Sequence, residues 1–363
     1  MMERIHSRAK GITSHDSAVE ASHPAEVDAR RRLVAGAIGL AAVTGVPKLA
    51  SAASQYTLRL ATWGSPNAPQ VSAFVGRFQK LVAEASHGRI SVQNFPAGSL
   101  VDERSVPSSI QSRVVDIALT TMGSWASIAP MAGVLNTVLF SPTGPGFEKA
   151  IGPGTALFNS FDADMAKHGA RLLATLYNGP VVVVSNQPMS SPAAFKGKTV
   201  RVFDRLTAQI VHTLGGAPST IGVADVYPAL QRGTVQAAIG GLEGAIGLKE
   251  YEVAKQLLAT NGLFGILMTG YVMSKASLES LPADLQKIVL QAGYEAGRQA
   301  SRDMVTAYAE ELAGMQKHGM TVTLLQPGTA PYQAFKTALS PLARAEQAKF
   351  APQMVKQVLD AQR

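Results

Sequence analysis

The sequence predicts an α/β protein with two lobes and a long helix that spans both of them. Short strand segments alternate with helical segments in two separate stretches of the chain, and one helical pattern of about 35 residues follows them. Alternation of strand, helix and strand implies parallel pairing with helical crossovers. The 363 residues are 46% hydrophobic and 16% charged, which supplies enough apolar side chains for sizeable packed cores.

The N-terminal segment has the features of an export signal. Arg30, Arg31 and Arg32 directly precede an apolar run from Leu33 to Val46. This run is shorter than the roughly 20 helical residues that cross a hydrocarbon core, and Ala50-Ser51-Ala52 offers the small residues that a signal peptidase accepts. The arginines also resemble a twin-arginine signal. We therefore expect residues 1–52 to be a signal peptide and the mature chain to be periplasmic, with an uncleaved anchor as the alternative.

Residues 53–170 are expected to form mainly the first lobe. The segment Thr57–Trp63 alternates apolar and polar side chains, which is typical of a strand. Apolar residues then recur at helical spacing from Val71 to Ala85, and His87-Gly88 follows as a stop. The remaining elements expected here are a strand over Ile90–Phe95, a helix over Asp102–Arg113 and a strand over Val115–Thr121.

Residues 171–280 are expected to form mainly the second lobe, again with α/β character. The expected strands are Leu172–Tyr177, Val181–Val184, Thr199–Phe203 and Ala237–Ile239, and the expected helices are Leu206–Leu214 and Ala224–Arg232. Residues 281–363 follow with one helical face from Leu285 to Met315, which ends at His318-Gly319. About 35 helical residues reach roughly 50 Å, which is longer than one small lobe. We expect this helix to span both lobes and the C-terminal helices to pack back on them.

Several classes of function find no support in the composition and motifs. The absence of cysteine excludes thiolate metal sites, cysteine nucleophiles and disulfides. None of the seven histidines pairs with another at a helical metal spacing, and no phosphate-binding loop or nucleophile elbow is found. The net charge is +8, but the lysines and arginines of the expected mature chain are scattered singly and form no basic patch. We expect no catalytic centre, metal, cofactor or nucleic-acid partner.

Four segments in fixed order resemble the solute-binding proteins of tripartite ATP-independent periplasmic (TRAP) transporters, of the dicarboxylate type. They are Gly88–Leu100, with its Pro-x-Gly-x-Leu turn, Phe195–Phe203, Leu214–Pro218 and Asp225–Val235. Each motif is weak alone, and the ordered set is specific. The resemblance implies a two-lobed periplasmic-binding-protein fold that captures a small carboxylate-bearing solute and delivers it to the membrane subunits of a TRAP permease.

The resemblance places Arg201 at the arginine with which the family grips the carboxylate of the solute. A guanidinium suits this role because its planar fork of donors matches a carboxylate and stays charged when desolvated. For an arginine considered without the motif, a surface position is the ordinary alternative.

Further candidate ligand-binding residues stand at or near predicted strand ends, where ligands of open α/β sheets collect. Each has a structural alternative, such as a core position for an aromatic side chain or a turn for an asparagine. The candidates are Trp63, Asn67, Trp125, Tyr177, Asn178 and Phe203.

Two departures from the sialic-acid-binding relatives bear on the solute. Val181 stands where those relatives have a second arginine, and Gly240 stands in a stretch where they carry an asparagine. We therefore expect a monocarboxylate with a modest hydrophobic part, such as a 2-keto acid, an aromatic acid or a cyclised amino acid. Glu243 is expected either to neutralise a second group of the solute or to act as a helix-start acid.

Two other functions compete with that of a transport receptor. In an exported enzyme, Arg201 would orient an organic acid beside Asp204 or Glu243, although no histidine lies nearby in sequence to act as a base. In a sensor input protein, the closed form would be presented to a membrane receptor rather than to a permease. The sequence does not separate the sensor from the transport receptor.

Overall fold

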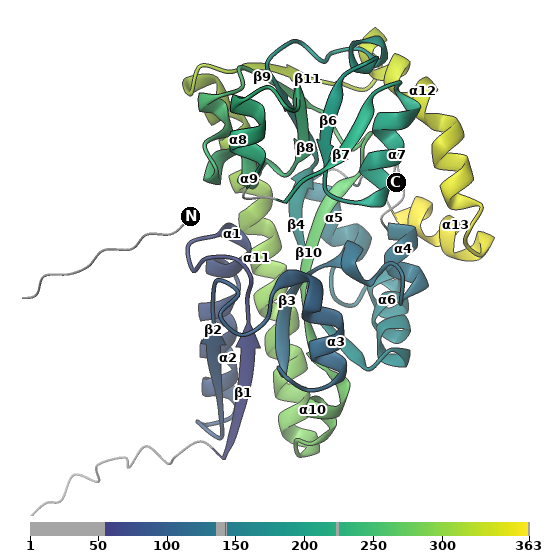
Figure 1. Cartoon of the computed structure of the whole chain (residues 1–363). Helices are drawn as coiled ribbons and strands as arrows, with labels where there is room; N and C mark the ends of the chain where they lie inside the picture. Colours follow the sequence, from purple (N-terminus) through teal and green to yellow (C-terminus); the bar gives the residue numbers. More distant parts are fainter. Residues whose placement is uncertain (1–54, 136–141, 143, 223–224, 362–363) are drawn as a thin grey trace, which may run out of the picture. The chain divides into compact units, whose positions relative to one another are not determined.

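Two β-sheets form the centres of two lobes within the unit Ser51–Arg363 (Figure 1). The computed structural model describes residues 55–135, 142, 144–222 and 225–361. The expected signal peptide, residues 1–52, lies outside the described residues. Within the described ranges, no helix has both the length and the apolar character needed to cross a membrane.

The first lobe is built on a five-stranded sheet with the order β2-β1-β3-β10-β4. β1 pairs in parallel with β2 and β3, as the alternation of elements predicts, whereas β10 is antiparallel to both β3 and β4. The strands are β1 Tyr56–Ala61, β2 Ile90–Phe95, β3 Ile117–Thr121, β4 Ala170–Pro180 and β10 Ile266–Ser274. The helices around this sheet are α1 Pro69–Ser72, α2 Val75–Ala85, η1 Glu103–Ser105, α3 Val106–Gln111, η2 Met122–Trp125, α4 Pro130–Leu135, α5 Gly144–Ile151, α6 Ala156–Lys167 and α10 Lys275–Glu279.

The second lobe is built on a six-stranded sheet with the order β11-β9-β5-β8-β6-β7. β6 pairs in parallel with β7 and β8, and β5 is antiparallel to β8 and β9. The strands are β5 Val182–Ser185, β6 Thr199–Val202, β7 Ala217–Thr220, β8 Ala237–Gly240, β9 Gln256–Ala259 and β11 Thr321–Leu324. The helices are η3 Pro192–Phe195, α7 Arg205–Thr213, α8 Val226–Gln231, α9 Leu242–Gly247, η5 Glu250–Glu252, α12 Ala330–Gln347 and α13 Pro352–Ala361, of which α13 packs on the first lobe.

The lobe boundary differs from the expected position near residue 171. The strand that begins at Ala170 belongs to the first sheet, because β4 pairs antiparallel with β10 along most of its length. The chain enters the second sheet only after Pro180, and it returns to the first sheet with β10. Two short connections, around Val181 and over residues 260–265, therefore join the sheets.

The predicted long helix is α11, which runs from Ala283 to Lys317 over 35 residues. It packs against α2, α5 and β4 of the first lobe and against α9 and β11 of the second, so it spans both lobes as predicted (Figure 1). Its contact with β4 is close because small residues face the strand. A Cβ atom at Gly297 would lie 2.5 Å from the Cβ atom of Ala174.

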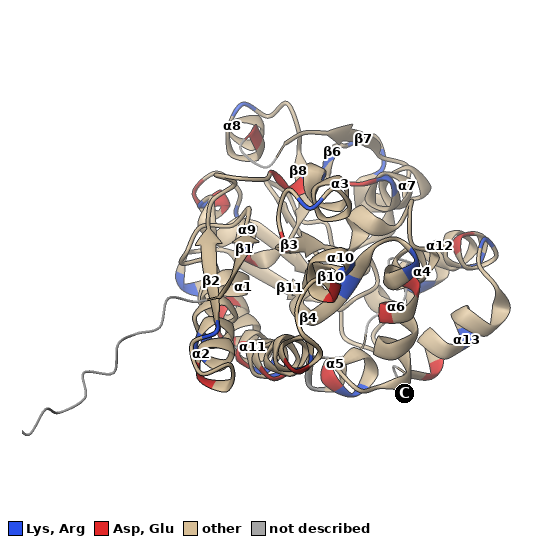
Figure 2. Ribbon diagram, turned by 90° about the horizontal axis from the view of Figure 1, so that it is seen from below, with Lys and Arg blue, Asp and Glu red and all other residues tan. Residues whose placement is uncertain are grey.

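Charged side chains of both signs are interspersed along the ribbon (Figure 2). Some of them join elements that are distant in sequence. Arg302 on α11 donates two hydrogen bonds of 2.7 Å to the carboxylate of Glu148 on α5.

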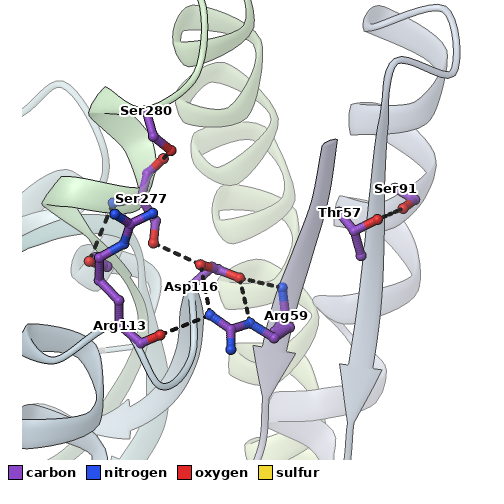
Figure 3. Close-up of polar contacts among 8 residues, drawn as sticks. Thr57, Arg59, Ser91, Arg113, Asp116, Ser277 and Ser280 are labelled. Carbon is purple, nitrogen blue, oxygen red and sulfur yellow. Dashed lines mark hydrogen bonds and ion pairs between the residues drawn. The ribbon is translucent and has the colours of Figure 1, made fainter. Parts of the chain in front are cut away.

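A buried carboxylate fastens the first sheet at the amino ends of its parallel strands (Figure 3). Asp116 accepts hydrogen bonds from the backbone N–H of Arg59 at 2.8 Å, from Arg59 Nε at 3.0 Å and from Ser277 Oγ at 2.7 Å. These bonds join β1, the start of β3 and α10. The opposite edge of the sheet, where the parallel strands end, is left for other groups.

Candidate functional site

Arg201 is a buried arginine whose guanidinium is anchored by neutral groups. It lies on β6 with 5% of its surface exposed. Its Nε donates to the carbonyl of Ile221 at 3.0 Å and its Nη1 donates to the carbonyl of Ile239 at 2.9 Å. Among the described residues, Nη2 has no hydrogen-bond partner. The ends of β7 and β8 thus orient a charged fork that retains free donors, as an anion site requires.

Burial acts against the charge of this arginine. Desolvation lowers the pKa of Arg201, whereas the charges of Glu250 and Asp204 raise it. An arginine keeps its proton even when its pKa is lowered somewhat, so Arg201 is a buried cation at neutral pH. Because an uncompensated buried charge is costly, an incoming anion would be stabilised here.

The surroundings of Arg201 leave room beside the guanidinium. Gly240, at the end of β8, carries no side chain, and a Cβ atom there would lie 3.6 Å from Arg201 Nη1. Phe203 is 37% exposed, and the centre of its ring lies 5.8 Å from Arg201 Cζ. The structure therefore brings three of the predicted residues together on the second lobe: a cation, an open backbone position and an exposed aromatic ring.

Buried polar atoms without a partner gather near one edge of the first lobe. Among the described residues these atoms include Trp63 Nε1, Gln70 Oε1, Asn94 Oδ1 and Asn178 Nδ2. Trp63 follows β1, and Asn94 lies near the end of β2. Asn178 lies near the end of β4, which pairs with the start of β10, and the start of β10 pairs on its other side with the carboxyl end of β3. Buried polar groups are normally satisfied, so unpaired donors and acceptors at this edge are candidates for solute contacts.

Asn178 is held in a fixed orientation. Its Oδ1 accepts hydrogen bonds from the backbone N–H of Thr269 at 3.1 Å and from Thr269 Oγ1 at 2.6 Å. These two bonds identify Oδ1 as the acceptor and leave the Nδ2 donor free. The neighbouring Tyr177 is 4% exposed and packs against Phe147 and Tyr308. Burial raises the pKa of Tyr177 to about 12, so its phenol stays neutral.

Trp125 and Asn67 occupy opposite extremes of exposure. Trp125 is fully buried in the core of the first lobe, where its Nε1 donates to Thr120 Oγ1 at 3.1 Å. Its donor is therefore already satisfied inside the lobe, and we assign it no solute contact. Asn67 lies exposed in the loop between β1 and α1.

Glu243 stands in the first turn of α9, which is the helix-start position considered from the sequence. Its carboxylate folds back over Gly241, where a Cβ atom would approach Oε2 to 2.5 Å. Burial, together with the charge of Glu311 on α11, raises the pKa of Glu243 to about 7. Its electrostatic neighbours are thus on α11, and Arg201 is not among them.

A cavity of about 270 Å³ lies beside α11, away from Arg201. Tyr177, Tyr308 and Leu312 contribute to its lining, and Tyr177 is the predicted site residue that reaches it. None of the described residues that line it carries a charge. We therefore place the candidate site at Arg201, where the chemistry for an anion is found, rather than at this cavity.

Some residues of the site were not anticipated from the sequence. Gln70 is 3% exposed, and its position shortly after the first strand end is the signal that could have suggested it. Glu250 is 7% exposed and lies within electrostatic reach of Arg201, although about 50 residues separate the two in sequence. No local pattern marks Glu250, because its position depends on the folded second lobe.

The chain is similar to several known proteins. The uncharacterized protein y4mM of Sinorhizobium fredii is 28% identical over 80% of this chain, and the chain spans 53% of the length of y4mM. The sialic acid-binding periplasmic protein SiaP of Vibrio cholerae is 26% identical, with 71% of this chain and 78% of SiaP covered. The structure of DctP7, a Bordetella pertussis extracytoplasmic solute receptor binding pyroglutamic acid, has a TM-score of 0.74 at 18% identity, with 84% and 99% of the two chains covered.

These similarities establish both the fold and the family of the chain. The likeness to DctP7 confirms the predicted two-lobed periplasmic-binding-protein fold. The profile of the DctP family, described as bacterial extracellular solute-binding protein, family 7, matches residues 60–349, which include α11 and every strand of both sheets except the first part of β1. This chain therefore belongs to the family 7 of bacterial extracellular solute-binding proteins.

Proposed function

We propose that this protein is a periplasmic receptor that binds a small organic acid between its two lobes and delivers it to a TRAP permease. The observation that carries the proposal is the buried guanidinium of Arg201, which is anchored by two carbonyl groups and retains free donors. A carboxylate would satisfy those donors and neutralise the charge. The unpaired polar atoms on the first lobe supply the groups that would complete the site upon closure.

We further propose that the solute is a monocarboxylate. Val181, at the connection between the lobes, is 2% exposed and offers no second cation, and Gly240 leaves apolar room beside Arg201. The donors Trp63 Nε1 and Asn178 Nδ2 would suit an oxo or amide oxygen on the same molecule. A 2-keto acid or a cyclised amino acid fits this combination, and pyroglutamic acid, the ligand of DctP7, is one such compound.

The test is calorimetric titration of the mature protein with a panel of acids: pyruvate, 2-oxobutyrate, benzoate, pyroglutamate, glucuronate and sialic acid. Native mass spectrometry of the freshly purified protein can add any acid that co-purifies. We expect binding of pyruvate, 2-oxobutyrate, benzoate or pyroglutamate rather than of the polyhydroxylated acids glucuronate and sialic acid, and recovery of the bound acid unchanged after prolonged incubation would argue against an enzyme. Failure of all these acids to bind would contradict the proposal.

The decisive variants change Arg201 alone. Loss of one partner of a buried charge pair costs about 2–5 kcal/mol, so Arg201→Ala should weaken binding by roughly 30-fold to several thousand-fold. Arg201→Lys keeps the charge but loses the planar fork, and we expect intermediate binding. Arg232→Ala removes an exposed arginine of the same lobe and should bind like the wild type. If Arg201→Ala remains folded and binds within about threefold of the wild type, this residue does not hold the carboxylate.

A further inference from the structure

Glu250 is a buried carboxyl group of the second lobe that the proposed function does not yet use. It lies in η5 and is 7% exposed. Its side chain has no hydrogen bond and no ion pair closer than 4 Å with any described residue. Buried carboxyl groups usually have such partners, so the position of Glu250 calls for an explanation.

The backbone directs this side chain inward by an unusual turn. Lys249 adopts a left-handed conformation with φ 54° and ψ 36°, which is uncommon for a residue with a side chain. The backbone N–H groups of Val253 and Ala254 both donate to the carbonyl of Glu250, at 3.1 and 2.9 Å, and hold the turn in place. As a result Lys249 and Glu252 are exposed, whereas Glu250 between them is buried.

Glu250 and Arg201 lie on the same side of the second sheet. Val200 and Val202, which flank Arg201 on β6, point into one core cluster. Arg201 therefore points to the opposite side, where its cross-strand neighbour Ala238 belongs to a second cluster together with Ala254 of the turn after η5. The two residues carry opposite charges, and each acts on the ionisation of the other.

No other charged group competes for Glu250 from the elements packed on η5. Tyr227 on α8 donates to Glu252 rather than to Glu250, at 3.1 Å. Glu243 on α9 interacts electrostatically with Glu311 of α11. Tyr251 of η5 stacks on His318, and Lys255, which follows η5, donates from Nζ to the carbonyl of Tyr251. Among the described residues, Arg201 is the charged group that acts on Glu250.

We propose that Glu250 is the buried counter-charge of Arg201 in the solute-free protein, and that Glu250 takes up a proton from the solvent when a solute carboxylate pairs with Arg201. The proposal rests on the proposed function of Arg201 and extends it. Once the solute neutralises the guanidinium, two carboxylates would share a poorly hydrated site and would repel each other. Protonation of Glu250 removes this repulsion, and the solute itself stays ionised.

The pKa of Glu250 places this proton uptake in a pH range where it can be measured. Burial raises the pKa of Glu250 and the charge of Arg201 partly offsets this effect, which leaves the pKa at about 7. At pH 8 roughly nine-tenths of Glu250 would be ionised before the solute binds, so the protein should take up nearly one proton per bound solute. By the same linkage, the dissociation constant should rise by up to about tenfold per pH unit above pH 7.

The experiment is calorimetric titration with pyroglutamate, or with whichever acid of the panel binds most tightly, at pH 8 in buffers of different ionisation enthalpy. The slope of the observed heat against buffer enthalpy counts the protons exchanged. We expect an uptake near one for the wild type and near zero for Glu250→Gln, whose affinity should also become independent of pH. Glu252→Gln, on the same turn but exposed, and Glu243→Gln, whose pKa is also raised, should both retain the uptake.

The possible failures can be told apart. If no acid binds the wild type, the proposed function fails and this inference falls with it. If an acid binds without proton uptake, or if Glu250→Gln retains the uptake, the role of Glu250 is wrong while the receptor function stands. Should Glu250→Gln not fold, loss of the uptake in Glu243→Gln or Glu252→Gln would still overturn the assignment.

Discussion

Asp116 shows how one side chain fixes the position of several elements in the first lobe. Its carboxylate accepts three hydrogen bonds of 2.7 to 3.0 Å from Arg59 and Ser277 (Figure 3). These interactions hold the pKa of Asp116 below its usual value despite burial, which acts in the opposite direction. An Asp116→Asn substitution should lower the free energy of unfolding by about 1–3 kcal/mol, because at least one donor loses its acceptor. Thermal or urea unfolding measures this change.

The pH dependence of the same group has a definite sign. A carboxyl group with a lowered folded pKa stabilises the protein above its unfolded pKa of about 4, and this contribution disappears as the pH falls further. The difference in stability between the wild type and Asp116→Asn should therefore shrink below pH 4. Asp303→Asn breaks an ion pair whose carboxylate is 44% exposed, and its effect should stay below about 1 kcal/mol. Equal losses from both substitutions would contradict the assigned role of Asp116.

At the level of single residues, the sequence indicates side chains that lie within a local motif, but not side chains whose position depends on the folded lobe. Arg201 is the predicted carboxylate-binding residue because it lies within an ordered set of motifs. Trp125 was a plausible site residue beside a strand end, but its hydrogen bond to Thr120 satisfies it inside the core. No local sequence pattern marks Glu250 as buried. Its burial depends on a left-handed turn at Lys249, and no glycine stands at that position to indicate such a turn.

At the level of elements, the contact between α11 and β4 depends on the absence of side chains. A Cβ atom at Gly297 would lie 2.5 Å from that of Ala174, whereas a Cβ atom at Gly314 on the same helix would meet no atom within 4 Å. Gly297→Ala should therefore destabilise the protein by about 1–3 kcal/mol through overpacking. Gly314→Ala should stabilise it by about 0.5–1 kcal/mol, because alanine loses less entropy in a helix.

This pair is a matched test, since the chemical change is the same and only the position on α11 differs. Chemical denaturation gives both values, and opposite signs are expected. Two changes of the same sign and similar size would show that helix propensity, rather than the approach of α11 to β4, governs the effect.

The elements that the sequence predicted correctly are those with a strong local period. The helical face from Leu285 to Met315 predicts α11, whose bounds in the structure are Ala283 and Lys317. The sequence pattern predicts the strand that forms β4 but assigns it to the second lobe, because its pairing partner β10 lies about 90 residues further along the chain. Antiparallel pairing over that distance leaves no local pattern in the sequence. The sequence therefore predicts that a strand forms here but not which sheet the strand joins.

At the level of the whole molecule, the connections between the two sheets suit a hinge. Two short chain segments, α11 and the link between α12 and α13 join the lobes. Gly179, next to the first connection, has φ 85°, and a Cβ atom there would lie 2.2 Å from the ring of Tyr308 on α11. The hinge backbone and α11 are thus in direct contact, and few residues need to change conformation for the lobes to move.

Solute binding should close the lobes, because Arg201 lies on one lobe and the unpaired polar atoms of Trp63 and Asn178 lie on the other. A solute that touches both sets binds the closed form better and shifts the population towards it. Small-angle scattering should show a smaller radius of gyration at saturating solute. At a hundredfold excess over the dissociation constant, the wild type should also gain about 2.7 kcal/mol of stability.

Arg201→Ala provides the control for closure, because it removes the principal contact on one lobe and leaves the hinge unchanged. Its scattering profile should be the same with and without the acid, and its melting temperature should not rise. A wild-type profile that stays unchanged at saturation, with binding verified by calorimetry, would instead show that the site is complete within one conformation. The unpaired polar atoms of the first lobe would then have to contact the solute without movement of the lobes. In that case a permease would not recognise the loaded receptor by its closed form.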